Sequence, residues 1–211
     1  MYLDLFTKSL EMTSSRNPET NMTFFIGNVD PHTEDTRRKL VEIGKRGGQF
    51  YEYSPHMVLN TLVRNSNQDL ADVYIPVTTP DEAAAALRIQ AEVFGFDYDE
   101  IVETMGLPPS SSRLETYLLR AGGVPVCTAQ LVRDENGACA SLWNVATLLE
   151  YQRKGYATQL LQSVIDQAKK RGISHIHLMA TLDGEPVYKR IGFTTIQRYG
   201  VFEIPGTYGR K

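Results

Sequence analysis

The chain has 211 residues, 42% of them hydrophobic, which is enough to bury one large core or a core with a smaller companion lobe. Its 22 basic and 25 acidic residues leave a formal net charge of only -3, which argues against a nucleic-acid or anionic-membrane partner. Cys127 and Cys139 have no Cys or His neighbours at metal spacing, which predicts two reduced core thiols rather than a disulfide framework or a zinc site.

Residues 1–21 mix polar residues after a short apolar start and predict a loosely attached N-terminal arm. They lack the basic start and the continuous apolar run of a signal peptide. No apolar stretch approaches the roughly 20 residues that a membrane-spanning helix needs. We therefore expect a cytoplasmic protein with no membrane partner.

Residues 22–71 predict a small N-terminal α/β lobe, and residues 72–211 predict the main domain. The boundary is placed near residue 70 because residues 64–69 are polar and favour turns. The lobe is expected to contain, in order, a strand at 22–26, a helix at 34–45, a strand at 50–53 and a short helix after Pro55.

The main domain predicts an α/β fold with a mixed-direction sheet, since an antiparallel meander is followed by a strand-helix-strand unit. Its first helix is marked by Thr79, Pro80, Asp81 and Glu82, which supply a hydroxyl cap, a first-turn proline and two acids. The expected strands are 73–77, 113–121, 124–133, 138–148, 173–180 and 193–204, and the expected helices are 80–94, 98–105, 156–171 and 185–191.

The start of the helix at 156–171 carries an unusual charge pattern. A helix N-terminus presents free N–H groups and a partial positive charge, so acids are favoured there. This one is preceded by Arg153 and Lys154, and by Gly155, whose missing side chain allows an anion to approach the backbone. Taken alone, these three residues also fit a solvated basic loop. The spacing of a P-loop and that of a dinucleotide-binding glycine motif are both absent from the sequence.

The segment Gln152-Arg153-Lys154-Gly155-Tyr156-Ala157 resembles the acyl-CoA signature Gln/Arg-x-x-Gly-x-Gly/Ala of the GNAT (GCN5-related N-acetyltransferase) superfamily. The downstream run from Gly184 to Phe193 is similar to the short helix and Tyr-x-x-x-Gly-Phe ending of that family. The resemblance covers about residues 72–204. Residues 22–71 look like the partial half-domain that precedes some members.

This resemblance implies that acetyl-CoA is the acyl-donor co-substrate. No metal is expected. The pantetheine arm would lie between the strands at 138–148 and 173–180, held by backbone groups near Val145, Ala146 and Thr147. The pyrophosphate would be bound by the segment from Gln152 to Thr158. The cofactor-binding residues expected there are Gln152, Arg153, Lys154, Gly155, Tyr156, Ala157 and Thr158. Where many relatives carry Asn this chain has Thr181, which leaves contacts of that residue to the CoA arm open.

Tyr188 is the candidate catalytic acid. Acyl transfer from a thioester needs a donor for the departing thiolate, and a phenol stays protonated at neutral pH because its reference pKa is about 10, against about 8.5 for a thiol. The alternative is that Tyr188 only packs on the sheet. The general base stays open among Glu115, Asn144, Asp97 and Glu103.

Two further groups of residues have open readings. His175 and His177 face the same way on a strand, which permits metal binding, but they lack a third ligand, so structural histidines are favoured. Phe94, Phe96 and Tyr98 fit either the border of an acceptor pocket or a hydrophobic cap on the core.

The resulting hypothesis is an N-acetyltransferase that moves an acetyl or other acyl group from its CoA thioester to an amine by direct attack in a ternary complex. A non-catalytic acyl-CoA-binding sensor or pseudoenzyme is the alternative. The expected partner is a small-molecule or peptide amine acceptor. The acceptor's identity, the acyl-chain preference, the role of the N-terminal lobe and the oligomeric state, including a homodimer, stay open.

Overall fold

A computed structural model describes residues 22–27, 33–63, 74–105 and 113–204. Contacts divide the chain into two compact units. Unit 1 combines the chain up to His56 with 180–185 and the stretch from Thr195 onward, and unit 2 combines Met57–Met179 with Pro186–Thr194. The units therefore do not consist of two consecutive stretches of chain. The expected arm at 1–21, the linker at 64–69 and the boundary near residue 70 lie outside the described residues.

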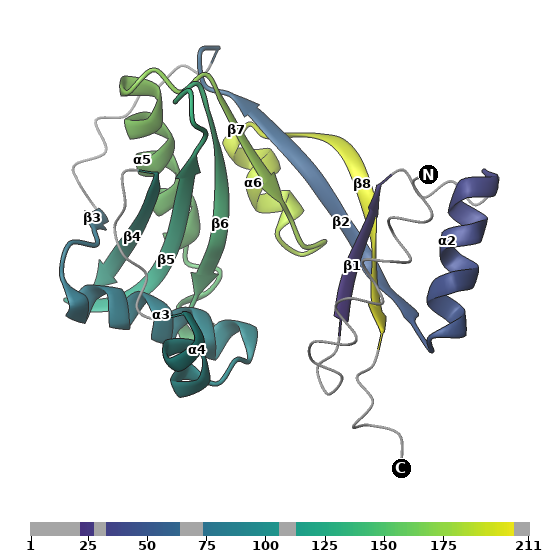
Figure 1. The fold of residues 1–211 in the computed structure, drawn as a ribbon. Helices are drawn as coiled ribbons and strands as arrows, with labels where there is room; N and C mark the ends of the chain where they lie inside the picture. Colours follow the sequence, from purple (N-terminus) through teal and green to yellow (C-terminus); the bar gives the residue numbers. More distant parts are fainter. Residues whose placement is uncertain (1–21, 28–32, 64–73, 106–112, 205–211) are drawn as a thin grey trace. The chain divides into compact units, whose positions relative to one another are not determined.

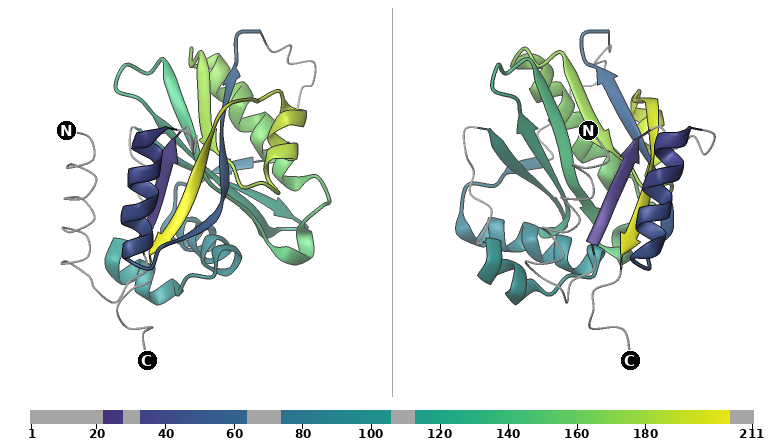
Figure 2. Two further views of the ribbon diagram at one scale, coloured as in Figure 1. Left: turned by 90° about the vertical axis from the view of Figure 1, so that its right-hand side faces the viewer. Right: turned by 45° about the vertical axis from the view of Figure 1, so that its right-hand side comes forward.

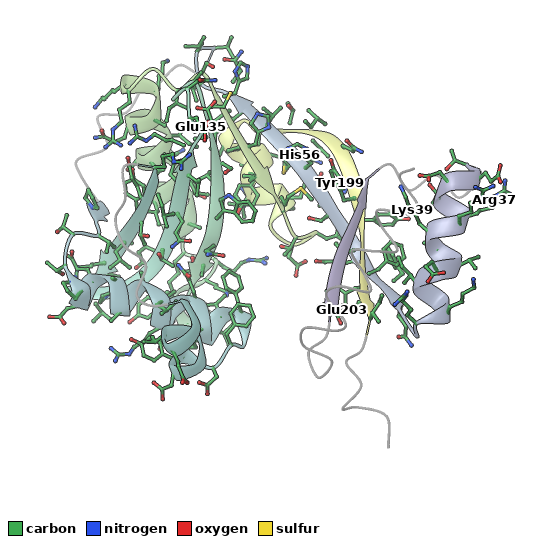
Figure 3. All side chains as sticks on the ribbon, viewed as in Figure 1. Arg37, Lys39, His56, Glu135, Tyr199 and Glu203 are labelled. Carbon is green, nitrogen blue, oxygen red and sulfur yellow. The ribbon has the colours of Figure 1, made fainter. Side chains whose placement is uncertain are left out.

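The described residues of unit 1 form strands β1, β8 and β2 and helix α2 (Figure 1). Strand β1 (Met22–Gly27) pairs antiparallel with β8 (Thr194–Ile204), and β8 neighbours β2 (Gln49–Asn60). Helix α2 (Glu34–Lys45) lies beside β1 and β8 (Figure 2) and begins at Thr33, whose side chain accepts from the Thr36 amide. His56 and Tyr199 lie across β2 and β8 with ring centroids 6.1 Å apart (Figure 3).

Strand β2 corrects one prediction, since no short helix follows Pro55 in the described residues up to Val63. The strand continues through Pro55 to Asn60, and its second half alternates between buried and half-buried residues. Locally, Pro55 predicts a helix start because proline is favoured at the first helical position. In the strand, its carbonyl accepts from the Ala180 amide at 2.9 Å, and the neighbouring Ser54 hydroxyl donates to the Ala180 carbonyl at 2.9 Å. These contacts come from residues remote in sequence.

Unit 2 contains a mixed sheet in the order β2-β7-β6-β5-β4-β3, in which β2 contributes its last four residues. Strands β3 (Tyr74–Pro76), β4 (Leu114–Ala121), β5 (Val124–Arg133) and β6 (Cys139–Thr147) are antiparallel in succession, and β7 (His175–Met179) runs parallel to β6. The expected fold class, a mixed α/β sheet, is confirmed. Pairs of residues at Gly122-Gly123 and Asn136-Gly137 form the predicted turns.

Helices cover both faces of this sheet. Helix α3 (Pro80–Phe94) packs on Leu118 and Ala146, and helix α5 (Tyr156–Lys170) packs across β4, β5 and β6. Arg171, at the end of α5, reaches Glu115, which lies an odd number of residues from Leu118 on the same strand. Because strand side chains alternate between faces, the two helices lie on opposite faces. Helix α3 ends at Gly95 and is followed by α4 (Tyr98–Met105), and α6 (Glu185–Ile191) precedes β8.

The predicted helix starts and ends are well reproduced in this unit. Thr79 and Glu82 form the reciprocal capping box at the start of α3. Within the described part of the chain, no helix combines the length and the apolar character required to cross a bilayer.

Candidate functional site: an acyl-donor site in unit 2

Strands β6 and β7 are paired only over their first halves. The register runs from Cys139 opposite His175 to Ser141 opposite His177, and Figure 1 shows the two strands separating beyond this point. The rest of β6, from Leu142 to Thr147, has β5 on one side and no described register with β7 on the other. An extended ligand could add itself to such an open strand edge by backbone hydrogen bonds.

A β-bulge in β6 marks the place where the strands separate. Trp143 lies opposite Gln130 and Ala146 lies opposite Thr128, so β6 carries one extra residue between these pairs. Asn144 absorbs the irregularity with a positive φ of 48°, and its side-chain amide donates to Gln130 Oε1 at 2.7 Å. A bulge bends its strand and increases the local twist, which turns the end of β6 away from β7.

The backbone of β6 aims some of its amides at the open edge. The Leu148 amide donates to the Val126 carbonyl of β5 at 3.0 Å. Because N–H direction alternates along a strand, the amides of Val145 and Thr147 point away from β5, as the expected pantetheine contacts require. The Ala146 amide instead points toward β5, and the Ala146 side chain is buried in the core beneath α3.

Helix α5 begins at Gly155 without a cap of its own. Gly155 adopts a left-handed conformation with φ of 88°, no side chain caps the helix, and its first turn holds no acid. Among the described residues, the amides from Arg153 to Thr158 donate to no backbone carbonyl. A Cβ at Gly155 would meet no atom within 4 Å, so the space beside this residue is open. Such a helix end is suited to bind an anion.

The residues just before the helix are cationic and exposed. Arg153 has a positive φ of 62°, a conformation that costs a non-glycine residue about 1–2 kcal/mol. Lys154 places its ammonium 5.3 Å from the centre of the Tyr151 ring. Neither side chain forms an ion pair with a described residue, so the turn gathers positive charge that no described residue neutralises.

Gln152 links this turn to the end of β6. Its side-chain amide donates to the Thr147 carbonyl at 3.0 Å, whereas its backbone amide donates to the Leu149 carbonyl of a short 3-10 turn at 3.2 Å. The backbone amide is therefore already used, which differs from the expectation that it faces the pyrophosphate. The side chain instead fixes the strand end relative to the turn.

Tyr188 lies on α6 with its ring packed edge-on against Phe193, at a centroid separation of 5.8 Å. The side chain is half-buried. Burial, with a smaller effect from the nearby Cys127, raises the pKa of Tyr188 to about 12. The phenol therefore stays protonated throughout the neutral range. Packing and a chemical role are compatible here, because the ring supports the hydroxyl.

Cys127 contacts the end of β6 and lies near Tyr188. It is fully buried on β5, directly opposite Thr147, whose hydroxyl donates to Cys127 Sγ at 3.1 Å. Burial raises the pKa of the Cys127 thiol to about 11, so it remains neutral. The sequence does not predict that Cys127 lies near Thr147 and Tyr188. The three residues belong to different elements, and their spacing along the chain carries no signal of their proximity.

The four candidates for the general base lie in different settings. Glu115 is bound by Arg171, with both oxygens 2.6 Å from Nη1, and by Arg133 and the Tyr117 hydroxyl. Desolvation alone would raise its pKa, but these hydrogen bonds and charges lower it overall. That makes Glu115 a weak base, used to tie α5 to β4. Asn144, Asp97 and Glu103 are exposed, and the general base stays unassigned.

The remaining sequence candidates show no common site. His175 and His177 are both half-buried, and the His175 ring lies 2.9 Å from the Ser174 hydroxyl. Within the described ranges, no group of three His, Cys, Asp or Glu side chains could hold a metal ion. Phe94 and Phe96 pair with each other at 6.0 Å and are 41% and 59% exposed, so they do not form a cap over the core.

Comparison with known proteins identifies the family. The model of the acetyltransferase (GNAT) family matches residues 83–193, which is more than half of the chain and contains every site residue described above. The ribosomal protein bS18-alanine N-acetyltransferase of Escherichia coli K12 is 29% identical over 133 residues, covering 60% of this chain and 84% of the relative.

Solved structures agree on the fold. A GCN5-related N-acetyltransferase from Sphaerobacter thermophilus superposes with a TM-score of 0.66 at 14% identity, over 96% of this chain and 66% of that one. A GCN5-related N-acetyltransferase from Kribbella flavida gives 0.60 at 20% identity, over 81% of this chain and 65% of that one. This chain thus spans just under two thirds of each. Given the site and the family match, the chain belongs to the acetyltransferase (GNAT) family of transferases.

Proposed function

We propose that this protein is an N-acetyltransferase that uses acetyl-CoA as the acyl donor and transfers the acetyl group directly to an amine acceptor. The observation that carries the proposal is the start of α5. An uncapped helix N-terminus, a left-handed glycine and two exposed cations lie together just after the end of β6, where Gln152 donates to the Thr147 carbonyl. A diphosphate satisfies the free amides and neutralises the cations at once.

In this proposal, the donor lies along two consecutive elements. The pyrophosphate binds the amides from Arg153 to Thr158, with the Arg153 and Lys154 side chains adding charge. The pantetheine arm continues along β6 and takes hydrogen bonds from the Val145 and Thr147 amides. Gln152 keeps the two parts in register through its bond to the Thr147 carbonyl.

The chemical step forms one bond and breaks one. The neutral amine nitrogen attacks the thioester carbonyl, the carbon–sulfur bond breaks, and the electron pair leaves on sulfur while the ammonium loses its proton to a base or to water. Tyr188 donates a hydrogen bond to the departing sulfur. Its pKa of about 12 lies about 3.5 units above that of a thiol, equivalent to about 5 kcal/mol, so donation rather than complete proton transfer is the expected role.

Acceptor-dependent thiol release tests the function. Purified protein is mixed with acetyl-CoA and a chromogenic disulfide, and pools of amines, polyamines, amino acids and peptides are added in turn. A peptide that begins with alanine belongs in the panel because the bS18 relative modifies an alanine. Release that requires an acceptor supports the enzyme. Tight acetyl-CoA binding without release for any pool supports the sensor alternative instead.

A further inference from the structure

Two polar side chains are buried on one face of the sheet of unit 2. Thr116 of β4 and Gln130 of β5 are only 1% and 7% exposed. They lie opposite each other in the register, and Gln130 Nε2 donates to Thr116 Oγ1 at 3.3 Å. Thr116 shares its face with Leu118, which packs against α3, so both side chains lie on the face that α3 covers. Burying an amide and a hydroxyl costs free energy unless they are hydrogen-bonded, so packing alone favours apolar residues at these positions.

This chain of hydrogen bonds ends at Asn144, the residue of the β6 bulge. Gln130 Oε1 accepts from Asn144 Nδ2 at 2.7 Å, so both ends of the Gln130 carboxamide are used. Gln130 thereby holds the Asn144 carboxamide in one orientation. Asn144 Nδ2 carries two hydrogens, and among the described residues only Gln130 accepts from it. The second N–H of this exposed side chain is therefore available to a ligand.

The open edge of β6 brings the reactive end of the donor next to Asn144. In the proposed binding mode, the diphosphate lies at the Gly155 turn and the pantetheine arm follows β6 back toward its start. The arm contains two amide groups, which match the two outward amides of Thr147 and Val145, so its thioester lies beyond Val145. The arm cannot extend past Ser141, because β7 pairs with β6 up to that residue. Asn144 is the first residue beyond Val145 in this direction.

We infer that the second N–H of Asn144 Nδ2 donates to the thioester carbonyl oxygen of acetyl-CoA, and that Gln130, itself fixed by Thr116, is the residue that positions it. The inference rests on the proposed function, because it needs the donor to lie along β6. All of these residues belong to unit 2.

The contact stabilises charge that develops during acyl transfer. When the amine nitrogen forms its bond to the carbonyl carbon, the carbonyl electron pair moves onto oxygen. When the carbon–sulfur bond breaks, that pair forms the carbonyl again and the bonding pair leaves on sulfur. A donor that is held in place before the reaction stabilises the transient negative oxygen. Asn144 would thus serve the oxygen, whereas Tyr188 serves the sulfur.

Two matched ligands test the contact without an amine acceptor. S-ethyl-CoA has a methylene in place of the thioester carbonyl of acetyl-CoA. The variant Asn144→Gly removes the carboxamide and keeps the bulge, because glycine readily adopts the positive φ of 48°. By calorimetry, it should reduce the preference for acetyl-CoA over S-ethyl-CoA about threefold to tenfold relative to wild type, the value of one hydrogen bond. Asn136→Gly, at an exposed position of the turn between β5 and β6, should leave this preference unchanged.

Infrared spectroscopy gives a readout that a general effect on stability would not produce. The carbonyl band of isotope-labelled acetyl-CoA should lie at higher frequency when bound to Asn144→Gly than when bound to wild-type protein, because a hydrogen bond to the oxygen weakens the carbonyl bond. Gln130→Met keeps Asn144 but removes its anchor. It should cause part of the same loss of preference, and none in the Asn144→Gly background.

The outcomes separate this inference from the proposed function. An Asn144→Gly variant that weakens both ligands equally, or neither, with an unchanged carbonyl band, would overturn the inference and leave the acyl-donor site intact. Wild-type protein that binds neither ligand would refute the donor site and the inference together. A further loss of preference from Gln130→Met in the Asn144→Gly background would overturn the positioning role of Gln130. If Gln130→Met does not fold, the two glycine variants still decide the role of Asn144.

Discussion

Replacing Gly155 by glutamate tests the anion site most directly. A Cβ added at Gly155 would meet no atom within 4 Å, and the left-handed φ of 88° costs about 1–2 kcal/mol of folding stability. The added carboxylate lies among the amides that would hold the diphosphate. Two unit charges 4 Å apart at an effective dielectric constant of about 20 repel by about 4 kcal/mol. Arg153 and Lys154 offset part of this, so we expect acetyl-CoA affinity to fall about 100-fold or more.

The other end of the same helix supplies a matched control. Gly172 has a φ of 85° and equally open surroundings, so Gly172→Glu carries the same backbone cost and the same charge. Isothermal titration calorimetry with acetyl-CoA should show the loss for Gly155→Glu alone, while both variants melt at similar temperatures. Equal acetyl-CoA affinities in the two variants would refute the reasoning, because the effect of the added carboxylate would then not depend on its position at the Gly155 turn.

Three further predictions concern the same unit. Tyr188→Phe should lower kcat by about tenfold or more and leave the KM for acetyl-CoA nearly unchanged; because the pKa of Tyr188 is raised to about 12, the ratio of wild-type to variant kcat should stay constant up to pH 10. Arg153→Gln with Lys154→Gln should weaken acetyl-CoA binding by calorimetry and reduce its salt dependence, whereas an unchanged salt dependence would contradict the charge assignment. Glu115→Gln should destabilise the fold by about 1–3 kcal/mol at pH 7. Since the folded-state pKa of Glu115 lies below 4.5, that difference is present above pH 4.5 and should disappear as the pH falls through the folded-state pKa; a denaturant series across pH measures it.

Local sequence patterns determined much of unit 2. Helix α3 begins at Thr79 because a hydroxyl cap, a proline and two acids stand in consecutive positions, and the structure forms the predicted capping box. The start of α5 at Gly155 followed in the same way from apolar spacing and from a charge pattern unsuited to a self-capped helix. Such signals work because their interactions span only a few residues.

Other features were decided by contacts between residues far apart in the chain. Strand β2 continues through Pro55 because Ala180 provides its hydrogen bonds, and this overrides the local preference of proline for a helix start. The bulge at Asn144 depends on the pairing of β6 with β5, which no local pattern of β6 encodes.

The site residues also divide into those that local sequence predicts and those that only long-range contacts bring together. The sequence alone predicts the Gly155 turn and Tyr188 as site residues, because both belong to short contiguous motifs. Only the tertiary structure placed Cys127 beside Thr147 and bound Asn144 to Gln130, since each pair comes from separate elements whose association depends on the packed sheet. A sequence lists the groups that can react or bind, whereas long-range packing fixes their distances, their burial and therefore their pKa values.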